Sequence, residues 1–141
     1  MKIIKNILYF IISWTWGFIQ SFVGLIMFFV FALKKSIVKI EHFNGSLIVF
    51  VRGFNGVSMG YFIFLKYSKY FFEKDRITVK HEYGHFLQHL MLGIFYILVV
   101  GIKSFFNNRM SLISNDYRGL NYYKRFPEKW ADKLGKVERI R

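Results

Sequence analysis

The chain has 141 residues, with 21 Lys and Arg against 8 Asp and Glu, which gives a formal net charge of +13. This length allows one domain plus a membrane segment, and the absence of cysteine excludes a disulfide framework and thiol chemistry. Such a charge suits an anionic lipid surface or a nucleic acid. Because the chain has no nucleic-acid recognition motif, we expect lipid and no nucleic acid as a partner.

The first expected element is a membrane anchor. No charged residue occurs from Asn6 to Leu33, and a helix over this run would be about 42 Å long, more than a bilayer core requires. The run is too long for a signal peptide, and no small-x-small cleavage site follows it. We therefore expect an uncleaved transmembrane helix within an N-terminal membrane anchor, residues 1–35. In an alternative interpretation Gly17–Leu33 alone crosses the membrane.

A small antiparallel sheet is expected next. Ile37–Phe43 and Ser46–Arg52 flank Asn44-Gly45, a strong signal for a two-residue hairpin turn. Tyr61–Lys66 has the pattern of a third strand. An edge strand of such a sheet can hold an extended peptide by main-chain hydrogen bonds, or the sheet can simply pack on the helix that follows.

The stretch Thr78–Leu92 contains an H-E-x-x-H motif. If it is helical from an N-cap at Thr78 onward, His81 and His85 lie on one face, where both can bind one metal ion. Glu82 follows the first histidine directly, so its carboxylate can take a proton from a water on that metal. A polar helix face with two solvated histidines is the alternative explanation. We expect His89, one turn further on, to be a hydrogen-bonded or interfacial histidine and not a ligand.

The apolar segment Leu92–Ile102 is too short for an independent span but fits a re-entrant or interfacial segment. The polar loop Asn107–Arg125 carries Tyr and Arg side chains that can stabilise an oxyanion, and no spacing selects one of them. Positive charge is in excess after the first apolar run, so we expect residues 34–141 to lie in the cytoplasm.

A zinc site of this type needs a third protein ligand. Pro127 and Gly135 mark the start and end of a short helix, in which Glu128 and Asp132 lie four residues apart on one face. We expect Glu128 to bind the metal and Asp132 to accept a hydrogen bond from a ligand histidine and so fix its tautomer. Alternatively, both acids pair with neighbouring lysines on an exposed helix.

H-E-x-x-H followed by E-x-x-A-D-x-x-G resembles the gluzincin metallopeptidases, in particular the membrane-associated prenyl-protein endopeptidases and their bacterial heat-shock relatives. The resemblance implies zinc ligation by His81, His85 and Glu128. It also implies that Glu82 is the general base and that Asp132 supports a ligand. It covers these two motifs in a chain far shorter than those enzymes, so their substrates do not carry over. The W-A-D-x-L-G ending is also similar to that of small bacterial membrane proteins.

These patterns predict an α+β protein with an N-terminal transmembrane helix, a small antiparallel sheet, the H-E-x-x-H helix and a C-terminal helix carrying both acids. Residues 36–141 form its zincin-like metal-binding domain. The predicted function is a membrane-anchored zinc metallopeptidase, single-pass or with one re-entrant segment, that hydrolyses a peptide or protein substrate through a zinc-activated water. The alternative is a non-enzymatic membrane protein that keeps a structural or vestigial metal site and binds anionic lipid or a membrane partner.

Overall fold

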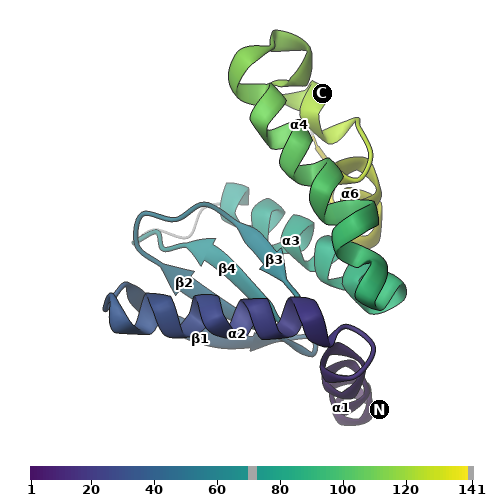
Figure 1. Ribbon diagram of the computed structural model, residues 1–141. Helices are drawn as coiled ribbons and strands as arrows, with labels where there is room; N and C mark the ends of the chain where they lie inside the picture. Colours follow the sequence, from purple (N-terminus) through teal and green to yellow (C-terminus); the bar gives the residue numbers. More distant parts are fainter. Residues whose placement is uncertain (70–72, 140–141) are drawn as a thin grey trace.

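A computed structural model describes residues 1–69 and 73–139, with the backbone alone at residues 73–75. The described residues form an α+β fold, as predicted, with six α-helices and a four-stranded sheet. Helix α2 (Phe18–Leu33) covers one face of the sheet and helix α3 (Glu73–Leu92) packs on the other (Figure 1).

The sheet is mixed, not purely antiparallel as predicted. Its strands stand in the order β1-β2-β4-β3, and their bounds are β1 (Ile37–Phe43), β2 (Ser46–Val51), β3 (Val57–Met59) and β4 (Phe62–Lys66). The predicted hairpin joins β1 to β2, with positive φ at Asn44 and Gly45. In contrast, β4 pairs with β2 in parallel.

The short edge strand β3, which the sequence analysis missed, explains this parallel pairing. The chain leaves β2, forms β3, and turns back into β4 at Gly60, whose φ is +60°. Strand β4 pairs antiparallel with β3 and inserts between β3 and β2, so it runs in the same direction as β2.

Both faces of the sheet are buried, which is why its central strands are continuous apolar runs. Alternate side chains of β2 and β4 point to opposite layers. The layer beneath α2 contains Val49, Val51, Phe62 and Phe64. The layer beneath α3 contains Ile48, Phe50, Ile63 and Leu65.

The N-terminal apolar run is not one continuous helix. Helix α1 (Lys2–Trp14) and α2 meet at an angle of 93°. At the bend, a Cβ on Gly17 would lie 2.0 Å from the His89 ring, so this close approach requires glycine. Of the described helices, none is by itself long and apolar enough to cross a membrane. Two bent pairs reach that length and composition together: α1 with α2, and Arg76–Phe95 with Ile97–Ile113.

Helix α3 begins at Glu73, so Thr78 lies inside it and is not its N-cap. It ends at Leu92, directly before Gly93, whose φ is +54°. The first turns carry charged residues without apolar periodicity, so the pattern did not reveal them. The remaining helical segments are η1 (Gly93–Phe95), η2 (Ile97–Gly101), α4 (Ile102–Ile113), η3 (Asn115–Tyr117), α5 (Leu120–Tyr123) and α6 (Glu128–Gly135).

Candidate metal centre

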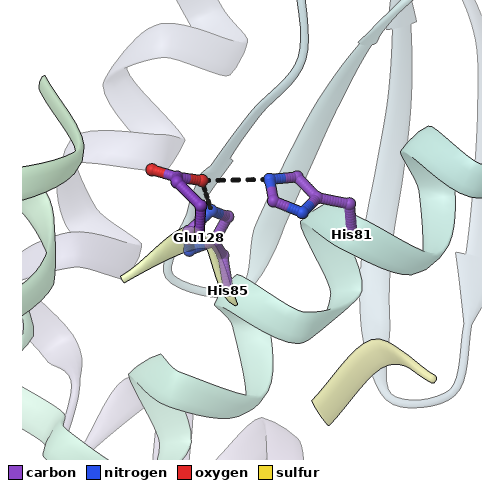
Figure 2. A group of neighbouring side chains, drawn as sticks. All are labelled: His81, His85 and Glu128. Atoms are coloured by element: carbon purple, nitrogen blue, oxygen red, sulfur yellow. Dashed lines mark hydrogen bonds and ion pairs between the residues drawn. The ribbon is translucent and has the colours of Figure 1, made fainter. Parts of the chain in front are cut away.

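Three buried side chains from two helices converge on one point (Figure 2). The Nε2 atoms of His81 and His85 lie 3.1 Å and 3.0 Å from the same oxygen, Oε2 of Glu128. The histidines come from α3 and the glutamate is the first residue of α6. Two imidazoles and a carboxylate that meet in this way can hold a metal ion.

The donor atoms fit such an ion in both chemistry and spacing. Imidazole nitrogen and carboxylate oxygen are normal ligands of zinc, at about 2.0–2.2 Å from the metal, and a tetrahedral site then separates its donor atoms by about 3.3 Å. The two nitrogen-to-oxygen distances of 3.0 and 3.1 Å are close to that separation. Both distances to Glu128 therefore suit such a site, and all three donor atoms lie within 4.8 Å of one another.

Hydrogen bonds on the far side of each ring fix the tautomers of the histidines. Nδ1 of His81 lies 2.6 Å from the Asp132 carboxylate, which accepts hydrogen bonds. Nδ1 of His85 lies 2.8 Å from Oε1 of Gln88, whose amide nitrogen donates to the Pro127 carbonyl. Because both partners are acceptors, both Nδ1 atoms carry hydrogen, so the Nε2 atoms are the ones that would bind a metal, in place of the hydrogens that they share with Glu128.

The centre attracts positive charge even without a metal. Burial lowers the pKa of His81, but hydrogen bonds to Asp132 and Glu128 outweigh this and raise it to about 9. Burial raises the pKa of Glu128, but hydrogen bonds from His81 and His85 outweigh this and hold it well below its ordinary value. A carboxylate that stays ionised while fully buried needs a cation beside it, either an imidazolium or a metal ion.

Two glycines let the helices approach closely enough to build the centre. A Cβ on Gly84 would lie 1.9 Å from the carbonyl oxygen of Ala131, and one on Gly135 would lie 1.9 Å from that of Lys80. Gly84 stands between the two histidines and Gly135 ends α6. Backbone contact at both points brings Glu128 within reach of α3.

Glu82 lies beside the centre and is held by the edge strand. Its carboxylate accepts a hydrogen bond from the main-chain N–H of Ser58 in β3. A Cβ on Gly56 would stand 2.8 Å from Oε1 of Glu82, so glycine leaves the space that this carboxylate needs. Burial raises the pKa of Glu82 above its ordinary value, although both nearby histidines partly oppose the shift. A carboxylate with a raised pKa is suited to receive a proton.

A cleft of about 430 Å³ opens on His81 and Glu82. Its other walls come from β3's leading loop, α4, and the segment around α5, and include Asn55, Asn108, Ser111, Tyr117, Arg118, Tyr122 and Tyr123. At Asn55 and Gly56 the cleft meets a second groove of about 820 Å³ along the α3 face of the sheet. Together they leave room for an extended chain past Glu82.

The structure places each predicted site residue. It brings His81, His85 and Glu128 together. Asp132 contacts the ring of His81, and Glu82 lies beside the three clustered side chains. The cation that pairs with Asp132 is Arg139, which donates two hydrogen bonds to it at 2.6 and 3.0 Å, and not one of the neighbouring lysines. His89 is interfacial, as expected, but both of its ring nitrogens lack a hydrogen-bond partner among the described residues.

Two polar residues at the centre, Gln88 and Ser104, were not identified from the sequence, and Tyr122 was included only among the Tyr and Arg side chains of the loop Asn107–Arg125. Gln88 holds His85, Ser104 donates a hydrogen bond of 2.6 Å to Glu128, and the Tyr122 side chain hydrogen-bonds to Glu128 as well. Gln88 follows His85 by three residues, a helical spacing that could have indicated it. Ser104 and Tyr122 lie on other segments, and no spacing relates them to the motif.

Comparison of the chain with protein-family models, with curated proteins and with solved structures found no match.

Proposed function

We propose that this protein is a membrane-anchored, zinc-dependent metallopeptidase of the gluzincin type. The observation that carries the proposal is the buried meeting of His81, His85 and Glu128 directly beside Glu82, with His81 and Glu82 lining an open cleft. Zinc held by these three ligands would supply a Lewis acid and a water of lowered pKa. The chemistry fits hydrolysis of a peptide bond.

The residues of the chain have distinct parts in this reaction. Glu82 takes a proton from the attacking water and returns it to the leaving amine, because its buried carboxylate has a raised pKa and faces the cleft. Asp132 and Gln88 keep the ligand histidines in one tautomer and orientation. Asn55 and Gly56, in the loop that precedes β3, line the cleft together with Glu82 and leave room for an extended substrate.

Membrane anchoring is supported by the surface of α1 and α2. Large apolar side chains are exposed along both helices, for example Ile3 at 74% and Phe29 at 57%. Exposed apolar area of this extent is typical of a membrane or protein contact. Lys2 and Lys5 precede the uncharged run Asn6–Leu33, and Lys34 and Lys35 follow it, as at the ends of a membrane-embedded segment. Lys and Arg are far more numerous after this run than before it, which supports a cytoplasmic position for residues 34–141.

The experiment separates ligand from base with two matched substitutions. In the purified full-length chain we expect about one Zn²⁺ per molecule and cleavage of a peptide library that chelation abolishes. Glu82→Gln keeps the size of the side chain but removes the base, so zinc should stay bound while cleavage is lost. Glu128→Gln replaces an anionic ligand, so zinc itself should be lost. Zinc content and cleavage are measured for all three proteins.

Two results would contradict the proposal. If Glu82→Gln loses zinc while Glu128→Gln keeps it, the two roles are misassigned. If the wild type holds zinc tightly but cleaves no peptide in detergent or in vesicles, the centre is structural and the protein is not an enzyme.

A further inference from the structure

Helix α4 has two chemically opposite faces, and one of them belongs to the metal centre. Its polar side chains recur at helical spacing and point toward the centre and the cleft. Ser104 donates a hydrogen bond to Glu128. Asn107, which is fully buried, donates a hydrogen bond of 2.8 Å to the carbonyl of Phe126. Asn108 and Ser111 line the cleft.

The opposite face is apolar and exposed. Phe105 is 67% exposed and Leu112 is 62% exposed. With the preceding π-helical turns η2, this face forms one stripe, made of Leu98, Val99, Ile102, Phe105, Phe106, Leu112 and Ile113, all of them exposed. A stripe of this length on a helix that is well packed on its other side indicates an external apolar phase.

Two cations accompany the stripe. Lys103 lies at its edge, and Arg109 lies within it, one helical turn from Phe105 and Phe106 and one from Leu112 and Ile113. The guanidinium of Arg109 lies 6.0 Å from the Phe105 ring centre, and the ammonium of Lys103 lies 5.2 Å from that of Phe106. Side chains of this kind keep their apolar stems in the acyl region and their charges among anionic headgroups. A protein partner would instead need acidic groups placed to match both cations.

The stripe also continues toward the proposed anchor. At the bend between α1 and α2, the Trp16 ring packs edge-on against Phe95, with ring centres 6.2 Å apart. Both rings are exposed, as is much of the neighbouring apolar surface of α2. The apolar surface therefore extends from the anchor to η2 and α4 through this contact.

From these observations we propose that the apolar stripe of η2 and α4 lies in the interface of an anionic bilayer, as a second membrane contact beside α1 and α2. This rests on the proposed anchoring and adds a consequence for the centre. Since the other face of α4 lines the cleft, the cleft opens on the side of α4 that faces away from the acyl chains, beside the membrane surface.

The absence of cysteine makes a direct test possible, because any introduced cysteine is unique. The single variants Phe105→Cys and Leu112→Cys probe the stripe, and Asn108→Cys probes the cleft face of α4. Two further variants serve as references: Phe22→Cys probes the proposed anchor, and Lys133→Cys probes an exposed position on α6. Each full-length protein is labelled with an environment-sensitive fluorophore and reconstituted into vesicles of equal parts phosphatidylcholine and phosphatidylglycerol. Quenching by iodide in water is compared with quenching by brominated acyl chains.

We expect labels at residues 105 and 112 to be quenched several-fold more by brominated lipid than by iodide, like the label at 22. Labels at 108 and 133 should show the reverse. If the label at residue 22 contacts lipid while the labels at 105 and 112 are quenched by iodide, the second membrane contact does not exist, and the proposed anchoring by α1 and α2 is still supported. If 105 and 112 are shielded from both quenchers, protein covers the stripe and the proposal fails. If 22 also fails to contact lipid, the anchoring itself is wrong.

Discussion

Gln88 connects the two helices that supply the proposed metal ligands. It is fully buried, accepts a hydrogen bond from His85 and donates one to the carbonyl of Pro127, the residue before Glu128. Replacing it with methionine keeps the length of the side chain but removes both hydrogen bonds. We expect Gln88→Met to bind zinc about 10- to 100-fold more weakly, the usual cost of losing a group that orients a metal ligand. Competition with a chromophoric chelator measures this affinity.

Gln20 provides the matched control for this variant. It is also fully buried and donates a 2.8 Å hydrogen bond to a carbonyl, that of Gly93, away from the metal ligands. Gln20→Met should reduce stability by a similar amount and leave zinc affinity unchanged. Equal losses of zinc affinity in both variants would mean that Gln88 acts through stability alone.

His89 should make stability depend on pH. Its burial lowers its pKa to about 4, from an ordinary value of 6.5. In the unfolded chain His89 therefore binds a proton between these two values while the folded protein does not. Stability is then complete above about pH 6.5 and falls as the pH drops toward 4. Thermal unfolding of the metal-free protein from pH 4 to 7 should show this slope, and His89→Leu should flatten it.

His81 does not interfere with that measurement. Its pKa in the metal-free fold is raised to about 9, so its stabilisation is complete below 6.5 and is lost as the pH rises through 9. The two histidines thus act in separate pH windows. An unchanged slope in His89→Leu below pH 6.5 would show that another group causes it.

At the scale of elements, the packing of α3 on α6 should be the least tolerant contact in the fold. A methyl group at Gly84 would collide with the main chain of Ala131, which can move only if the helices separate. We expect Gly84→Ala to cost about 3 kcal/mol or more of stability and to weaken zinc binding. Gly101→Ala is the control, because its nearest contact would be at 3.8 Å. Chemical unfolding measures the stability of both variants. If Gly84→Ala were as stable as Gly101→Ala, the close packing of α3 on α6 would be contradicted.

The elements that could be predicted from the sequence depend on local chemistry. The Asn44-Gly45 turn requires left-handed backbone at two successive residues and so specifies its hairpin. The spacing within H-E-x-x-H and between Glu128 and Asp132 follows from the helical repeat alone. These patterns are enough to indicate the ligand set, because few residues in the chain offer the necessary atoms.

The features that were missed depend on contacts between distant residues. The bend at Gly17 depends on the ring of His89 in another helix, and a run of apolar residues does not reveal it. The parallel pairing of β4 arises from β3, which has only three residues and little pattern of its own. Likewise Ser104 joins the centre because α3 turns back into α4 at 119°.

At the scale of the whole molecule, metal should control stability. The centre joins α3 to α6, so the metal binds only the folded state. Such a ligand stabilises the folded state by mass action, by about 4 kcal/mol when free zinc is a thousandfold above its dissociation constant. We expect a chelator to lower the melting temperature and added zinc to restore it. The double variant with His81→Ala and His85→Ala should melt at one temperature with or without zinc. If the melting temperature of the wild type did not change with zinc, the proposed metal centre would be wrong.

The ligand set has a further consequence, because it contains nitrogen and oxygen but no sulfur. The whole chain lacks cysteine, so no thiolate is present to favour soft metals or to be oxidised. Two imidazoles and a carboxylate discriminate poorly among cobalt, nickel and zinc, and the metal acquired would follow its availability. Cobalt should therefore enter the centre and report its coordination by visible absorption. Peroxide, which releases zinc from cysteine sites, should leave this metal in place.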